Sequence, residues 1–238
     1  TYVTGNNGKV KVRLSETVYD TDGGTGALET GDFTLSISGG SATLGSTNPT
    51  AITKDTPTFS AATIDNNLSG AQGLQLADLD FDGDVDIIAC GKSGDDLNWY
   101  ESDGSGSYTE RSIDLNLSGA QGLAINDIDG DGDLDIFATA RDGNQVALYT
   151  NNGSQSFTKT VIDSDLMQPH HVECTDLNED GFMDLIATGR TSDKIIWYSN
   201  DGSQNFTENV LRDDLNGAIT FFISDVDEDG DKLSLIHI

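Results

Sequence analysis

The chain repeats a nine-residue acidic string at a fixed interval of 49 residues. The string reads DLDFDGDVD from Asp78, DIDGDGDLD from Asp127 and DLNEDGFMD from Asp176, and it begins again as DVDEDGD at Asp225. No insertion or deletion breaks this register. A fixed period of this length indicates one supersecondary unit that is stacked several times.

Each repeat contains four short runs that are rich in β-branched and aromatic residues and are separated by Asn-Gly, Asp-Gly or Gly-Ser turns. In the second repeat the candidate strands are residues 108–113, 123–125, 136–139 and 146–149. Four strands in a unit of about 40–50 residues are typical of a β-propeller blade. A parallel β-helix uses shorter repeats and is a weaker alternative. The sequence therefore predicts an all-β fold that contains a partial β-propeller.

The repeats organise the chain into a periodic region, residues 58–232, and two flanking segments. Residues 1–57 lack the period, but residues 9–14 and 33–37 alternate like half-buried strands. This segment resembles part of a bacterial immunoglobulin-like β-sandwich. Residues 233–238 break the repeat and are interpreted as a non-native tail. Because the chain begins and stops within a pattern, we expect it to be part of a longer protein. The predicted propeller units are 58–106, 107–155, 156–204 and a truncated 205–232.

The charge balance is strongly acidic, with a net charge of −29 from 41 Asp and Glu residues against 12 Lys and Arg residues. Nucleic acid is therefore excluded as a partner, because phosphate binding needs a basic surface. Acidic chains are often disordered, but here the apolar residues recur with the repeat, which favours a folded protein. No segment is long and apolar enough to insert into a bilayer. Cys90 and Cys174 occupy ordinary strand positions of the repeat, so we expect free thiols.

The acidic loops have the composition of a site for a hard cation. Positions 1, 3, 5 and 9 supply carboxylate or amide oxygens, position 7 offers a backbone carbonyl, and glycine at position 6 permits a tight turn. Oxygen ligands in a flexible loop favour calcium over zinc or copper. The loops are not EF-hands, because Ala89, Ala138 and Ala187 stand where an EF-hand has its bidentate Glu. Solvated acidic turns that bind no ion are the alternative.

We expect one Ca²⁺ per complete repeat, three in all, and an incomplete fourth loop in which Leu233 stands at position 9. The predicted metal-binding residues are Asp78, Asp80, Asp82, Asp84 and Asp86 in the first loop; Asp127, Asp129, Asp131, Asp133 and Asp135 in the second; Asp176, Asn178, Asp180, Phe182 and Asp184 in the third; and Asp225, Asp227 and Asp229 in the fourth.

The acidic loops followed by Asp-Ile-Ile-Ala, Asp-Ile-Phe-Ala or Asp-Leu-Ile-Ala resemble the FG-GAP/VCBS repeat family over residues 58–232. The resemblance implies a calcium-loop β-propeller, with further blades in the parent chain. The Phe-Gly and Gly-Ala-Pro signatures of the family are not recognisable in this sequence. This departure favours the branch of exported bacterial proteins over integrin-like receptors.

One basic residue also recurs in each repeat, at Lys92, Arg141 and Arg190. In so acidic a chain this regularity indicates either a basic arc that binds an anionic glycan or protein, or ion pairs with nearby carboxylates. The candidate ion-pair partners are Asp95, Asp142 and Asp193.

No constellation of nucleophile, base and orienting group is visible around His170, His171 and Glu173, so we do not expect an enzyme. The sequence predicts a non-catalytic, calcium-binding propeller module of a secreted or cell-surface bacterial protein, for adhesion or for carbohydrate or protein recognition. The alternatives are an accessory or substrate-binding propeller of a larger secreted polysaccharide-degrading enzyme, and a structural spacer.

Overall fold

The computed structural model describes residues 2–6, 9–13, 62–224 and 234–237. The chain divides into two compact units, Thr1–Ala61 and Ala62–Ile238. In the first unit, β1 (Tyr2–Asn6) and β2 (Lys9–Arg13) form an antiparallel pair, and β2 lies within the strand predicted at residues 9–14. The strand predicted at residues 33–37 lies outside the described residues, as does most of the segment that resembles an immunoglobulin-like domain.

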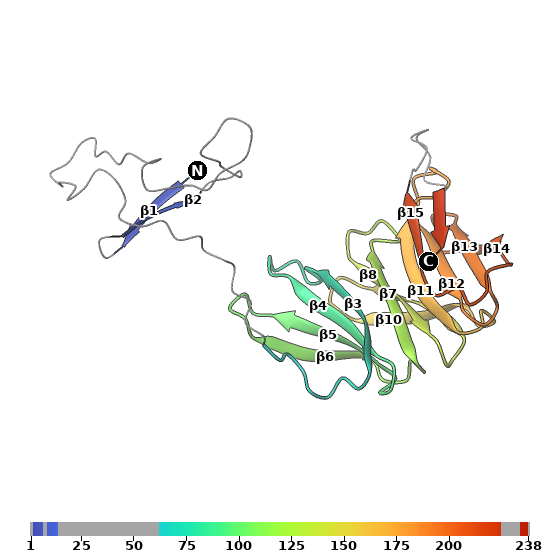
Figure 1. Ribbon diagram of the computed structural model, residues 1–238, viewed down its shortest axis with the longest axis horizontal. Coiled ribbons are helices and arrows are strands. Elements are labelled where there is room, and N and C mark those ends of the chain that lie inside the picture. The colour runs from blue at the N-terminus through green and yellow to red at the C-terminus, as the bar shows by residue number, and fades with distance from the viewer. Residues whose placement is uncertain (1, 7–8, 14–61, 225–233, 238) are drawn as a thin grey trace, which may run out of the picture. The chain divides into compact units, whose positions relative to one another are not determined.

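The second unit contains three four-stranded antiparallel sheets, each connected in simple up-and-down order (Figure 1). The first sheet consists of β3 (Ala71–Ala77), β4 (Asp86–Gly91), β5 (Asp96–Ser102) and β6 (Tyr108–Asp114). The second consists of β7 (Ala120–Asn126), β8 (Asp135–Ala140), β9 (Gln145–Asn151) and β10 (Phe157–Asp163). The third consists of β11 (Pro169–Thr175), β12 (Asp184–Gly189), β13 (Lys194–Asn200) and β14 (Phe206–Arg212).

These sheets confirm the all-β prediction and have the strand order of propeller blades. Their phase differs from that of the units defined on the sequence. The sheet of β3 to β6 runs across the boundary placed between residues 106 and 107, so each sequence unit ends before the outermost strand of its sheet. The reason is that a period gives the length of a repeat but does not show which four consecutive strands are hydrogen-bonded into one sheet.

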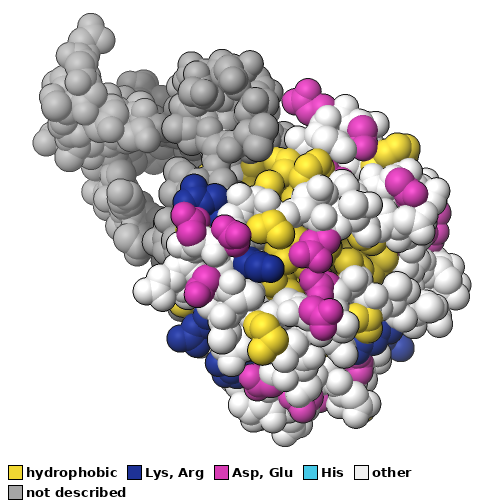
Figure 2. Space-filling view, turned by 90° about the vertical axis from the view of Figure 1, so that its right-hand side faces the viewer, with side chains coloured by type: hydrophobic (Ala, Val, Ile, Leu, Met, Phe, Trp, Pro, Cys, Tyr) yellow, Lys and Arg dark blue, Asp and Glu magenta, His cyan; other side chains and the backbone are white. Residues whose placement is uncertain are grey.

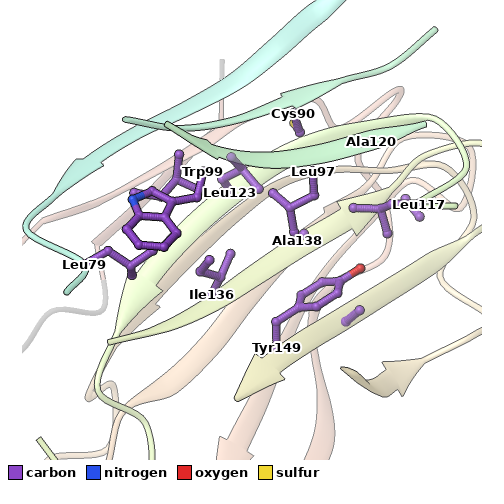
Figure 3. Close-up of a cluster of buried hydrophobic side chains, with 13 residues drawn as sticks. Leu79, Cys90, Leu97, Trp99, Leu117, Ala120, Leu123, Ile136, Ala138 and Tyr149 are labelled. Atoms are coloured by element: carbon purple, nitrogen blue, oxygen red, sulfur yellow. The ribbon is translucent and has the colours of Figure 1, made fainter. Parts of the chain in front are cut away.

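A hydrophobic core fills the space between each pair of neighbouring sheets. Figure 3 shows the core between the first and second sheets, where Trp99 and Leu79 meet Leu123, Ile136 and Tyr149. A second core lies between the second and third sheets, and a third joins the third sheet to β15 (Phe221–Ser224). Because the middle sheet is covered on both faces, its strand β8 is buried at every position, and residues 136–140 are apolar except for Thr139.

The inner strands of adjacent sheets lie side by side, with β7 in contact with both β3 and β11. Each inner strand has an irregular register near its start, at which a backbone N–H donates to a side chain of the second strand. The second strand supplies the acceptor, Cys90 Sγ in the first sheet and Thr139 Oγ1 in the second. Cys90 and Cys174 are both free thiols, as expected.

β15 pairs with β16 (Ser234–His237), a strand within the segment interpreted as a non-native tail. Pairing does not bear on whether this segment is native, and that interpretation stays a prediction. Within the described residues, no helix is long and apolar enough to cross a membrane.

Candidate metal centre

Each acidic loop connects the first strand of a sheet to the second and reverses direction through left-handed backbone. The glycines at position 6 have φ of 98° at Gly83, 96° at Gly132 and 92° at Gly181. No atom lies within 4 Å of a Cβ built on these glycines, so backbone conformation rather than space requires glycine there. Position 4 is also left-handed, although it carries Phe81 in the first loop and Glu179 in the third. One residue of the sequence indicated that second reversal, the glycine at position 4 of the second loop, Gly130.

The aspartate at position 1 closes each loop in the same way. Asp78 Oδ2 accepts a hydrogen bond from the Gly83 N–H at 3.0 Å, and Asp127 and Asp176 accept the equivalent bond. The second oxygen of Asp78, Oδ1, is buried and has no hydrogen-bond partner among the described residues. A buried carboxylate oxygen without a partner indicates a missing positive or proton-donating group.

Carboxylates from different positions converge within the first two loops. Oxygens of Asp78, Asp80 and Asp82 all lie within 4.8 Å of one another. The second loop brings together Asp127, Asp129 and Asp135 within the same limit. These are the two clusters of three or more acidic, His or Cys side chains found in the described part of the chain.

The third loop differs because an amide replaces one carboxylate. The Asn178 side chain donates a hydrogen bond from Nδ2 to Asp180 Oδ2 at 2.8 Å. Asp176 Oδ1 accepts a bond from the Asp180 N–H at 3.1 Å. The third loop thus keeps the backbone shape of the other two with one negative charge fewer at position 3. The predicted ligands Asp225, Asp227 and Asp229 lie outside the described residues.

The aspartate at position 9 is fully buried in all three loops and is held by backbone donors. Asp135 Oδ2 accepts from the Ile128 N–H at 3.1 Å, and Oδ1 accepts from the Asn151 N–H at 2.8 Å. Asp86 and Asp184 accept the corresponding pairs of bonds. This side chain therefore ties the acidic loop to the end of the third strand in the same sheet.

Position 7 was predicted to contribute its backbone carbonyl, and its side chain is directed elsewhere. A Cβ added at Gly104 would lie 2.3 Å from Asp84 Oδ2, and one added at Gly153 would lie 2.4 Å from Asp133 Oδ2. In the third loop Phe182 is similarly close to Gly202. The acidic loops and the Asp-Gly or Asn-Gly turns therefore lie on the same side of each sheet.

The clustered charges perturb one another. Burial, followed by the repulsion of nearby carboxylates, raises the pKa of Asp80 and of Asp129. Burial, together with the smaller effect of the charges of Asp129 and Asp131, raises the pKa of Asp135 to about 6. The two backbone hydrogen bonds act in the opposite direction. A bound cation would reverse these effects by favouring the ionised carboxylates. The donor set, oxygen only and partly unpaired, fits a hard metal ion.

The three basic residues occupy the same place in each sheet. The backbone N–H groups of Lys92, Arg141 and Arg190 donate to the carbonyl oxygen of residue 70, 119 or 168 at 3.0, 2.9 and 3.1 Å. Arg141 pairs with Asp142 at 2.7 Å, which is the ion-pair alternative. Neither Lys92 nor Arg190 forms an ion pair with a described residue.

The carboxylates expected to pair with Lys92 and Arg190 have another role. Asp95 Oδ1 accepts from the Gly119 N–H at 2.7 Å, and Asp193 Oδ1 accepts from the Gly217 N–H at 2.7 Å. Each of these bonds runs from one sheet to the loop that leads into the next, and Asn144 forms the equivalent bond to Gln168. Lys92 and Arg190 therefore do not form the ion pairs with Asp95 and Asp193 that the sequence suggested.

A second connection between sheets was missed in the sequence reasoning. A tyrosine of each third strand donates its hydroxyl hydrogen to an aspartate located 35 residues earlier, which precedes the first strand of the same sheet. The pairs and their distances are Tyr100 and Asp65 at 2.7 Å, Tyr149 and Asp114 at 2.7 Å, and Tyr198 and Asp163 at 2.5 Å. Both residue types recur at the 49-residue period, and this shared recurrence was the available signal.

Fold and loops together define a β-propeller class in which an acidic loop joins the first two strands of every sheet. The chain belongs to the FG-GAP-like repeat family, whose model matches residues 78–138, 127–187 and 176–232. No curated protein matches the chain.

Three solved structures are similar to part of this chain. A streptogramin B lyase is 18% identical with a TM-score of 0.43, and covers 62% of this chain and 43% of its own. The virginiamycin B lyase of Staphylococcus aureus is 19% identical with a TM-score of 0.43, and the match covers 66% of this chain and 46% of the lyase. An Agrocybe aegerita lectin that recognises non-reducing terminal N-acetylglucosamine is 26% identical with a TM-score of 0.45, and covers 62% and 39%. The chain therefore spans less than half the length of each.

Proposed function

We propose that this chain is a non-catalytic, calcium-stabilised β-propeller module of a secreted or cell-surface bacterial protein, and that it recognises a glycan or a protein. The observation that carries the calcium assignment is the unpaired, buried Asp78 Oδ1 within a cluster of three carboxylates. An unpaired anionic oxygen beside two further carboxylates is unfavourable unless a cation occupies the space between them.

The energetic argument favours an ion over a solvated turn. Two carboxylates about 5 Å apart repel by about 3 kcal/mol at an effective dielectric of about 20. An ion that neutralises them also favours the loop conformation that brings them together. Calcium at about a hundred times its dissociation constant adds roughly 2.7 kcal/mol to the free energy of unfolding for each site. Because position 9 connects the loop to the third strand, this energy stabilises the whole sheet.

The non-catalytic, recognition role is supported by the family and by the surface. Repeats of this family are generally non-catalytic modules. Sheets that are pinned together by buried cores and by repeated hydrogen bonds form a rigid support, on which loops at either end can present side chains to a partner. Lys92 and Arg190, which have no ion-pair partner among the described residues, are candidates for such contacts.

Thermal unfolding with and without calcium tests the proposal. We expect a chelator to lower the melting temperature by about 5–10 °C for each site that is emptied, and calcium to restore it. Asp80→Asn and Asp129→Asn should each remove the part of the calcium-induced increase in melting temperature that comes from the substituted loop. Asp165→Asn, which removes an exposed carboxylate outside the loops, should leave the effect intact. A melting curve that does not respond to calcium would refute the assignment.

A further inference from the structure

A pocket with a volume of about 200 Å³ lies between the first and second sheets. β5 and β6 of the first sheet form one side, and the hairpin that joins β9 to β10 of the second sheet forms the other. The residues that line the pocket include Trp99, Glu101, Arg111, Ser154, Gln155 and Phe157. None of them belongs to the acidic loops or to the three basic positions.

One of the residues that line the pocket carries a hydrogen-bond donor without an acceptor. Trp99 is only 3% exposed, and its Nε1 is buried with no hydrogen-bond partner in the described part of the chain. The indole ring forms part of the core between the two sheets, together with Leu79 and Leu123 (Figure 3). Trp197 has a similarly unpartnered Nε1, but only Trp99 lines the pocket, where an oxygen atom of a ligand would supply the acceptor that a buried indole N–H usually has.

Beside the indole lies a charged pair, Arg111 and Glu101. The Arg111 guanidinium lies 5.3 Å from the centre of the Trp99 ring. Its Nε donates to Glu101 Oε2 at 2.5 Å, and its Nη2 contacts the same oxygen. The two charges cancel, so the pocket does not select a charged ligand. The pair still presents spare N–H donors and a spare carboxylate oxygen.

The equivalent place between the second and third sheets serves as an internal comparison. There Leu148, Thr150 and Thr160 replace the indole, the carboxylate and the guanidinium. Gln204 is held by Thr150 Oγ1 at 3.3 Å and by Asp129 Oδ2 at 2.9 Å. Its counterpart Gln155 makes no side-chain hydrogen bond to a described residue, so its amide is free to bind a ligand.

We propose that the pocket between the first two sheets binds one neutral sugar residue of a glycan. A sugar ring has an apolar face, which fits Phe157, and hydroxyl groups that both donate and accept. Those hydroxyls match the Trp99 N–H, the Glu101 and Arg111 pair and the Gln155 amide. The volume is below the 300–1,000 Å³ or so that is usual for drug-sized ligands, which favours a single ring. This inference rests on the recognition role proposed above and gives it a ligand class.

The two tryptophans of the chain provide the readout, because each gives its own indole N–H signal in a nitrogen–proton correlation spectrum. Trp99→Phe assigns the Trp99 signal, and Trp197 is an internal control with an equally unpartnered Nε1. The calcium-saturated chain is titrated with glucose, galactose, mannose and N-acetylglucosamine at millimolar concentrations. We expect at least one of these sugars to shift the Trp99 signal in a saturable manner and to leave the Trp197 signal in place.

Matched variants then separate the pocket from other surfaces. Arg111→Leu should weaken sugar binding by about tenfold and Gln155→Ala by about threefold. Thr160→Ala, the change at the position equivalent to Arg111 between the second and third sheets, should leave binding unchanged. Gln155→Ala alters only a side chain on a hairpin, so it remains informative if Arg111→Leu fails to fold.

Three outcomes would overturn the inference. They are a Trp99 signal that no sugar in the panel shifts, a shift that sodium sulfate reproduces, and a sugar affinity that both Arg111→Leu and Gln155→Ala leave unchanged. The effect of calcium on the melting temperature is measured on the same sample. A response to calcium without sugar binding would overturn this inference alone, whereas sugar binding without a response to calcium would overturn only the metal assignment.

Discussion

The buried Asp135, at position 9 of the second acidic loop, is subject to two effects that favour opposite states of its carboxyl group. As an acceptor for two backbone N–H groups, Asp135 is best ionised, because a carboxylate accepts more strongly than a carboxylic acid. As a buried neighbour of Asp129 and Asp131, it is best protonated, and its pKa of about 6 shows that burial and repulsion dominate in the metal-free protein. A bound cation would resolve this conflict in favour of the ionised form.

The stability of the calcium-free chain should therefore rise as the solution becomes more acidic. The pKa of Asp135 is about 6 in the folded state against an ordinary value of 3.8, so between these limits the folded state takes up a proton that the unfolded state does not. The free energy of unfolding should increase by up to about 3 kcal/mol as the pH falls from about 6 to about 4. Melting temperatures of the metal-free chain across this range measure the effect.

Two controls bound this prediction. With saturating calcium the trend should reverse, because the ion binds ionised carboxylates and protons compete with it. Asp135→Asn should remove most of the slope from the metal-free protein. Below about pH 4 the gain should end as carboxylates with a lowered pKa are protonated, such as Asp103 at about 2. Identical slopes with and without calcium would contradict the explanation.

At the scale of strands and sheets, the hydrogen bond between a tyrosine of one sheet and an aspartate that precedes that sheet recurs in every repeat. Asp114 is the last residue of β6 in the first sheet, and Tyr149 lies on β9 of the second, so this bond joins two sheets. Lys159 Nζ donates to the same Asp114 oxygen at 2.8 Å. Burial, followed by the hydrogen bond to Asp114, raises the pKa of the Tyr149 hydroxyl.

Removing this hydroxyl should loosen the junction without creating a large cavity. We expect Tyr149→Phe to lower the free energy of unfolding by about 1–2 kcal/mol, since Asp114 loses one of its two side-chain donors. Tyr108→Phe is the matched control, because Tyr108 is 37% exposed and its hydroxyl forms no hydrogen bond with a described residue. Urea unfolding of both variants makes the comparison. Equal midpoints for the two variants would show that the bond contributes nothing.

The strands and loops could be predicted because their signals are local. The strand pattern at residues 136–139 and the acidic string before it each occupy no more than a dozen residues. Both patterns recur in three repeats at the 49-residue period. The sheet boundary near residue 107 and the pairing of Tyr149 with Asp114 could not be predicted in the same way. Both depend on which segments meet in space, and 35 residues separate the members of that pair.

Calcium binding by the acidic loops stays a prediction, and the sequence indicated only part of the loop geometry. Oxygen ligands at alternate positions indicated which residues converge, such as Asp78, Asp80 and Asp82. The sequence did not indicate that Asp86 is buried and accepts a hydrogen bond from the Ser102 N–H, because Ser102 ends the third strand and lies 16 residues away. The pocket beside Trp99 had no sequence signal, because its two sides come from different repeats.

At the scale of the whole molecule, strong acidity coexists with exposed apolar surface. Figure 2 shows one face on which Asp and Glu side chains are scattered among hydrophobic ones. On β3, Leu74 is 58% exposed and Leu76 is 62% exposed, whereas Leu123, the counterpart of Leu74 on β7, is 5% exposed in the core between the first two sheets. A surface that is core in one repeat and exposed in another favours association with a similar surface.

Replacing these two exposed leucines should reduce self-association. We expect the double variant Leu74→Thr and Leu76→Thr to sediment with a smaller weight-average mass than the parent chain at high concentration. Its free energy of unfolding should change by no more than about 0.5 kcal/mol, because neither side chain is buried. Val161→Thr, which changes an exposed residue of β10, should not alter sedimentation. An unchanged mass distribution for the double variant would count against a role for this face.

The bond from Asp95, Asn144 or Asp193 to the loop that leads into the following sheet has a consequence for how such proteins evolve. Every repeat brings one acceptor for its successor and one N–H donor for its predecessor, at the same two positions. Duplication or deletion of one whole period within a gene therefore leaves each acceptor matched to a donor. Recombination can therefore lengthen or shorten such an array while the same hydrogen bond continues to connect neighbouring sheets.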